Sequence, residues 1–563
     1  MFRFREIIMV LTAGVLTFSQ GALAKRDNKK ARANKSVSKT TKQQSSAPAA
    51  KPAAVAKQPV AKPVKEDPVE AWIALKAKFA QRQLTDAQVW IAIDQFEKKK
   101  HLLPEDRRHE LAQLRSDLLL KSGYPIMAAL FAGEALQSSK DLMDSTSVRS
   151  WEILATISKK RPIQEMIENL ASDPRLKNEV PKVFGNDWHY YVANALAGEG
   201  KLKEAVESYD KIRMSDRFFL PSKFQKGSIL ALQGDLEKAE IEFKSILRTE
   251  VVSLSPLKES VRNQIQDLAR LALGRMYYQD KNFGKAISAF RSVSREGAQF
   301  YDALSNQAWA LFMAGYPNHA LGALYGAESP FFKEVYNPEL PMLRSVIFYW
   351  MCRYDDSRAS LAEFNEKHSR AVDGLSSFLN QRALSEERAY DLFENLVTGV
   401  SSDSLGIPRE VLNTAAQEEG MLLLRDQYAA WIVETQKLAS KGIFGSTEAP
   451  ELVQQVVEKM TGQLRKKIGR QFLSELKAMQ QQYVQLNEQG QFLYVELLMS
   501  KKEQLLGREL HANSKLTEVP QARSVKGWSG QSMAWSGDGR EEFWWDEVGY
   551  HIYEAQPECH QNQ

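Results

Sequence analysis

The sequence predicts an all-α protein in which a helical solenoid is followed by long antiparallel helices and an aromatic C-terminal tail. A small residue recurs every 34 residues within 186–372, apolar residues recur every three or four residues within 373–520, and aromatic residues gather in 521–563. The first two patterns are typical of stacked helix pairs and long amphipathic helices. The segments ahead of them are a signal peptide (1–24), a disordered basic linker (25–68) and degenerate helical repeats (69–185).

Small and aromatic residues at fixed offsets carry the repeat. Ala205 and Ala239 are 34 residues apart, and so are Ala286 and Ala320. A small residue where two antiparallel helices cross lets their backbones approach, and an aromatic residue fills the space to the next pair. The residues that define the repeat are Ala205, Gly227, Ala239, Gly274, Tyr277, Ala286, Phe290 and Ala320.

This pattern resembles the tetratricopeptide (TPR) repeat, a helix–turn–helix unit. The resemblance implies stacked helices that bind partner proteins and rarely carry chemistry. The chain also resembles, more narrowly, envelope TPR proteins of predatory and gliding deltaproteobacteria, of the adventurous gliding motility type. That resemblance implies a periplasmic part of a multiprotein envelope machine. It is carried by Pro338-Glu339-Leu340, Phe348-Tyr349-Trp350-x-Cys352-x-Tyr354-Asp355, Val495-Glu496-Leu497-Leu498, and Phe543-Trp544-Trp545-Asp546-Glu547-Val548-Gly549-Tyr550 with Cys559.

A partner protein is expected on the concave face, near the first helix of each pair. Insertions break the 34-residue register at Thr249–Gln264 and at Ser329–Pro341, which carries Phe331, Phe332 and Tyr336. Insertions in solenoids map to loops on one face, often the binding face. These two either join that face or only lengthen the connection. Candidate partner-binding residues, chosen by helical phase, are Asn194, Lys226, Arg270, Arg275, Asn306 and Gln307.

The first 24 residues have the pattern of a secretory signal. Arg3 and Arg5 precede an apolar stretch from Ile7 to Phe18, and a small-x-small site ends at Ala24. We expect cleavage after Ala24, with an uncleaved anchor as the alternative. No later segment has the roughly 18 uninterrupted apolar residues of a membrane helix. The sequence therefore predicts an exported, periplasmic protein that is soluble or peripheral to the envelope.

The linker is strongly basic. Residues 25–65 hold ten lysines and two arginines against Asp27, so they carry a net charge of +11. Of the total charge of +5, the first 24 residues carry +1, which leaves −7 for the chain from Glu66 onward. The linker is either a tether attracted to an anionic envelope surface or a solvated spacer. Export argues against nucleic acid as a partner.

Longer helices are expected after the repeats. Leu384–Thr398 and Arg409–Ala439 have helical spacing, and Glu451–Leu486 has apolar residues at steps of three and four. We expect Asn487–Gly490 to turn the chain, so that Phe492–Leu510 returns as the second half of an antiparallel hairpin. Its apolar seam either dimerises as a coiled coil or is covered by neighbouring helices.

The tail and the cysteines raise two further alternatives. The tryptophans after residue 527 are costly to leave in water, so the tail docks on its own solenoid or on a partner. Cys352 and Cys559 are the only cysteines. They form a disulfide in an oxidising compartment, or Cys352 is a small buried core residue.

No catalytic or cofactor motif stands out. The eight histidines form no HExxH motif, and GxSxG is absent. Glu558-Cys559-His560 is weak as a metal site because its residues are adjacent at a terminus. We therefore expect no enzyme, cofactor or metal, and a scaffold or adaptor that binds an envelope protein. The alternatives are a subunit that self-associates through Glu451–Leu510 and an envelope enzyme with an unrecognised activity in 373–563.

Overall fold

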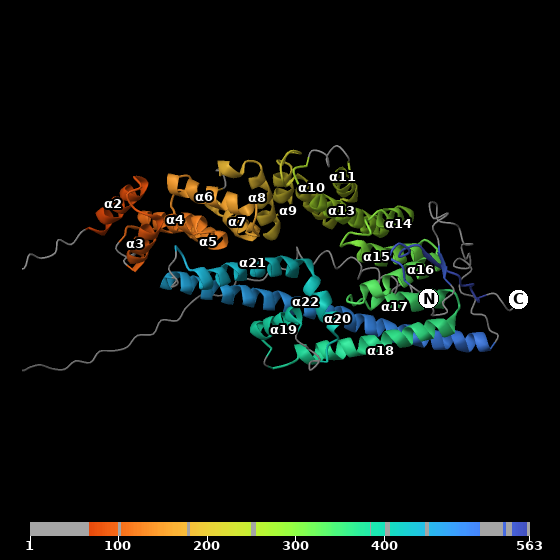
Figure 1. Ribbon diagram of the computed structural model, residues 1–563. Helices are drawn as coiled ribbons and strands as arrows, with labels where there is room; N and C mark the ends of the chain where they lie inside the picture. Colours follow the sequence, from red (N-terminus) through yellow and green to blue (C-terminus); the bar gives the residue numbers. More distant parts are fainter. Residues whose placement is uncertain are drawn as a thin grey trace, which may run out of the picture.

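The protein is described here by a computed structural model (Figure 1). In the described part of the chain the fold is all-α, as predicted, and one short two-stranded sheet is the exception. The predicted signal peptide and almost all of the predicted linker lie outside that part. The described residues are 67–98, 103–176, 181–248, 255–382, 384–399, 406–444, 450–506, 533–535 (backbone) and 543–559.

Consecutive helices pack in pairs that follow one another along a row from α2 to α18 (Figure 1). Short 3-10 turns, η2 to η4, lie at Pro174–Leu176, Lys182–Phe184 and Pro330–Phe332. The helices are α2 (Pro68–Ala80), α3 (Asp86–Lys98), α4 (Glu105–Lys121), α5 (Pro125–Ser138), α6 (Ser145–Ser158), α7 (Gln164–Ala171), α8 (Asp187–Gly198), α9 (Leu202–Tyr209), α10 (Phe219–Leu232), α11 (Leu236–Ile246), α13 (Glu259–Gln279), α14 (Phe283–Arg291), α15 (Phe300–Met313), α16 (Pro317–Ala327), α17 (Glu339–Trp350) and α18 (Tyr354–Leu379).

Most pairs turn through one residue with left-handed backbone, two positions after the first helix ends. In three cases this residue is a glycine with φ near +80°, namely Gly200 after α8, Gly234 after α10 and Gly315 after α15. Lys281 and Cys352 take the same place after α13 and α17, both with φ of 59°. Glycine is favoured there because it has no Cβ to clash with the backbone.

The repeat residues make the same contact in successive pairs. A Cβ on Gly227 would lie 2.8 Å from the ring of Phe243, and one on Gly274 would lie 2.3 Å from the ring of Phe290. Each glycine precedes its aromatic partner by 16 residues. The alanines at the 34-residue spacing are fully buried, so the period marks positions where two helix backbones approach closely. They are Ala205, Ala239, Ala286 and Ala320.

The helices from α18 onward differ from the prediction at three points. The segment Arg409–Ala439 is two helices, α20 (Arg409–Gln417) and α21 (Glu419–Lys441), because Glu418 has extended backbone with ψ of 142°. The break lets α20 pack on α19 (Glu386–Thr398) while α21 packs on α22 (Glu451–Leu505). The expected boundary between residues 372 and 373 falls inside α18.

The prediction of a hairpin turn at Asn487–Gly490 is wrong, because α22, which is 55 residues long, continues through this segment. Gly490 is not a turn residue but a close-packing residue, since a Cβ there would lie 2.9 Å from the ring of Phe364. The buried positions Leu486, Gly490, Leu493 and Leu497 keep the helical spacing across this point. The buried seam therefore belongs to one helix that neighbouring helices cover.

Helix α22 runs antiparallel to α18 and α21 and also packs on α19 (Figure 1). At 1.5 Å per residue its length is about 80 Å. In its first third, Lys467 pairs with Glu165 of α7, and near its end Lys501 pairs with Asp355 of α18. One helix thus contacts the row at both α7 and α18.

The described tail packs on the row. Strand β2 (His551–Tyr553) pairs in parallel with β1 (Met533–Trp535) and lies on α16. Val548 and Ala555 are buried in the same core as the helix pairs. None of the helices within the described ranges is long and apolar enough to cross a membrane.

Candidate protein-interaction site

The candidate contact residues on α8 and α10 are engaged inside the chain. Asn194 donates a hydrogen bond to Glu168 at 2.6 Å. Lys226 Nζ lies 2.6 Å from Asp210 Oδ1 and 2.8 Å from Glu242 Oε1. Burial raises the pKa of Glu242, but Lys223 and Lys226 outweigh it and hold the pKa below its usual value. These side chains therefore stabilise the stacking of neighbouring pairs.

The arginines on α13 also have intramolecular partners. Arg270 pairs at 2.8 Å with Asp267, a buried carboxylate that also accepts a hydrogen bond from the backbone of Ser294. Arg275 lies 3.2 Å from Asp302, whose side chain is 54% exposed. Asp302 therefore stays in contact with water when its partner is removed, whereas Asp267 would be left as a buried charge.

Asn306 and Gln307 do not form an accessible surface. They are only 7% and 4% exposed on α15. Asn306 donates to the carbonyl of Asp302, while Asn306 Oδ1 and Gln307 Nε2 have no hydrogen-bond partner within the described residues. Helical phase alone placed them toward a partner, but neighbouring helices cover both sides of α15.

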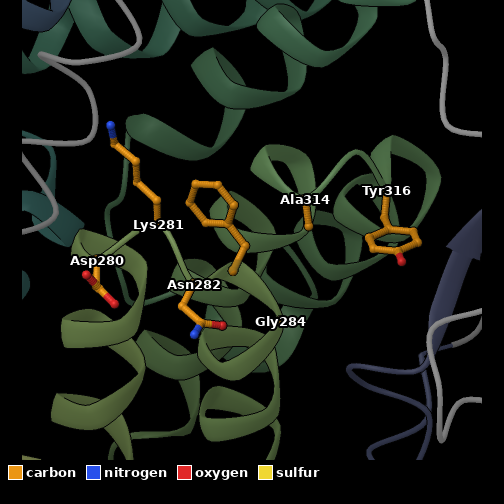
Figure 2. Close-up of a pocket in the computed structure, with 7 residues that line it drawn as sticks. Asp280, Lys281, Asn282, Gly284, Ala314 and Tyr316 are labelled. Atoms are coloured by element: carbon orange, nitrogen blue, oxygen red, sulfur yellow. The ribbon is translucent and has the colours of Figure 1, made fainter.

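A shallow hollow of about 540 Å³ lies between two successive turns of the row. Its lining residues come from the turn before α14 and the turn before α16, as Figure 2 shows. The polar ends of Asp280, Lys281 and Asn282 point in different directions and converge on no common point (Figure 2). Asn282 Oδ1 instead accepts the backbone N–H of Lys285 and caps α14. The polar side chains of these turn residues therefore form no convergent set in the hollow.

The tail occupies a seat on α16 that the sequence interpretation missed. A Cβ on Gly322 would lie 1.9 Å from the carbonyl oxygen of His551, and one on Gly326 would lie 3.2 Å from the nitrogen of Gly549. Two glycines four residues apart form a flat stripe on one helix face, which lets an extended chain lie directly on the helix. The spacing Gly322-x3-Gly326 was visible in the sequence as a signal for such close packing.

Trp545 and Arg295 fix the tail beside that stripe. The Trp545 ring packs edge-on against Phe300 and Phe331, at centroid distances of 5.7 and 5.3 Å. Arg295 donates to the carbonyls of Asp546 and Val548 at 2.6 Å, and its guanidinium lies 4.3 Å from the ring centre of Tyr550. The Ser329–Pro341 insertion therefore contributes Phe331 to the tail seat.

A disulfide holds the end of the tail. Cys352 is bonded to Cys559, with Cα atoms 5.0 Å apart. The backbone N–H of Glu558 also donates to the carbonyl of Met351. The sequence left two alternatives for the cysteines and two for the tail. In the structure the cysteines form a disulfide, and the tail packs on the helix row of its own chain. Cys559 is consequently no metal ligand, and within the described part of the chain no cluster of three histidine, cysteine or acidic residues could hold a metal.

A comparison of the chain with protein-family models finds no match, and neither does a comparison with curated protein sequences.

Proposed function

We propose that this protein is a non-catalytic TPR scaffold or adaptor of the bacterial cell envelope, exported to the periplasm, which binds another protein of a multiprotein complex. The narrower resemblance extends this proposal to a motility- or secretion-related machine. No cofactor and no nucleic acid enters it.

The observation that carries the proposal is the recurring glycine–aromatic contact. Gly227 with Phe243 and Gly274 with Phe290 have the same spacing and the same close approach in successive pairs. A repeated packing unit builds an extended helical surface, which is the kind of surface that repeat proteins use for binding. The export signal and the basic linker support the envelope location from sequence.

The test is affinity purification from detergent-solubilised envelopes with the full chain and with a chain that lacks residues 1–65. Both forms are expected to recover the same stoichiometric envelope protein, because the contact lies on the helical body. Recovery of no such protein by either form would contradict the adaptor role.

Arg275→Ala locates the contact. Its partner Asp302 is exposed, so the change leaves no buried charge. We expect weaker recovery of the envelope protein with this variant and unchanged recovery with Arg370→Ala, whose side chain is 68% exposed on α18. Equal recovery by both variants would remove Arg275 from the contact.

A further inference from the structure

The last four turns of α22 expose a broad apolar face. Seven large apolar side chains between residues 492 and 506 are each 44–76% exposed, and we call them the α22 patch. They recur at steps of three, four and seven residues, on the side of the helix away from the buried Leu493 and Leu497. The α22 patch consists of Phe492, Tyr494, Val495, Leu498, Met499, Leu505 and Leu506.

This face differs from the rest of α22. Between Ile468 and Leu486 the exposed positions of the helix are polar or alanine, as in an ordinary amphipathic helix. The α22 patch leaves roughly 500–700 Å² of apolar surface per chain, which is at the upper end of what monomers expose and somewhat below the ~800 Å² that each partner buries in a standard interface. An interface of that size can hold two proteins together.

The charges on the same face favour a second copy of this chain. Glu488 and Lys502 are exposed near opposite ends of the face and are 14 residues, or about 21 Å, apart along the helix. In an antiparallel pair with Val495 on the two-fold axis, each Glu488 faces Lys502 of the other copy, and Phe492 faces Leu498. A parallel pair would instead bring each charge against its own equivalent, which is repulsive.

We propose that the protein forms an antiparallel, two-fold dimer through the α22 patch, with Glu488 and Lys502 setting the register. This dimer is separate from the adaptor contact on the helix row. It would present two rows to the envelope and double the number of partner sites, which raises the apparent affinity of each.

Sedimentation velocity of the full chain, over about 1–100 µM, tests the proposal in the range where interfaces of this size associate. We expect a concentration-dependent dimer, and a monomer for Val495→Glu/Leu498→Glu. The matched control is Val433→Glu, because Val433 is 60% exposed on α21 outside the α22 patch. It should leave the dimer unchanged.

Charge reversal tests the register. Glu488→Lys and Lys502→Glu should each raise the dimer dissociation constant about tenfold, since each replaces two attractive pairs by two repulsive ones. The double variant should restore the wild-type value. A wild-type chain that stays monomeric throughout, as it would if other residues of the chain covered the α22 patch, overturns the proposal. Single variants that weaken the dimer without rescue in the double variant overturn it as well.

Discussion

Glu434 of α21 accepts a hydrogen bond from the backbone N–H of Ile126 at 2.8 Å, across 308 residues of sequence. Its second oxygen accepts the N–H of Met127 at 3.1 Å, so one carboxylate caps the first turn of α5. Nearby, Tyr124 donates to the carbonyl of Gly442 at 2.6 Å. These contacts join the beginning of the helix row to the helices that follow it.

Glu434→Ala should free the first turn of α5. Loss of a buried cap costs about 1–3 kcal/mol, which corresponds to roughly tenfold to hundredfold faster amide exchange. Hydrogen exchange at Ile126 and Met127 measures this directly, with Glu458→Ala on exposed α22 surface as the control. Unchanged protection of both amides would show that the carboxylate does not hold this junction.

Gly274→Ala should destabilise the repeat. The new Cβ would lie 2.3 Å from the buried ring of Phe290, and overpacking of this kind costs about 1–3 kcal/mol. Denaturant unfolding should show a lower midpoint. Gly462→Ala is the matched control, because a Cβ there meets nothing within 4 Å and alanine favours the helix by about 1 kcal/mol. A Gly274→Ala midpoint at or above that of the wild type would contradict the close packing.

Gly322→Val should lift the tail from α16. The valine side chain would overlap the backbone carbonyl of His551. The clash is with backbone, which cannot move aside as the end of a flexible side chain can. Limited proteolysis should cleave within residues 543–559 faster than in the wild type, while Gly284→Val, in open space on α14, leaves cleavage unchanged. Equal cleavage of all three proteins would argue against this seat.

The disulfide can be tested through the backbone of Cys352. Cys352→Gly/Cys559→Ser and Cys352→Ser/Cys559→Ser both lack the bond, so both should release the end of the tail to proteolysis. The glycine version should be the more stable by about 1 kcal/mol, because φ of 59° favours glycine. Equal unfolding midpoints of the two double variants would count against this account of the turn.

Glu339 should make stability depend on pH. Burial raises its pKa from 4.5 to about 7, although Gln482 donates to it at 3.0 Å. Folding therefore takes up a proton between pH 4.5 and 7, so stability is highest below about pH 4.5 and is lost as the pH rises through 7. At ~1.4 kcal/mol per unit the loss is at most a few kcal/mol.

Denaturant unfolding at pH 5 and pH 8 measures the effect. Glu339→Gln should reduce the difference between the two pH values, and Glu366→Gln, whose carboxylate is 76% exposed, should not. The same pH dependence in all three proteins would assign it to other groups.

The sequence by itself determined the helical class and the repeat. Local spacing sufficed, because the burial of Ala205, Ala239, Ala286 and Ala320 follows from helix geometry within neighbouring pairs. It also indicated the presence of an aromatic tail that needs cover.

Only the tertiary structure decided the long-range features. The local sequence around Gly490 predicts a turn. In the structure Gly490 lies inside one continuous helix, where it packs against the ring of Phe364, a residue far away in sequence. Helical phase predicted that Asn306 and Gln307 lie on the surface, but neighbouring helices bury them. The tail seat on Gly322, the cap by Glu434 and the bond between Cys352 and Cys559 likewise join residues far apart in the chain. Local periodicity indicates which face of a helix is apolar, but it does not identify the distant segment that covers that face.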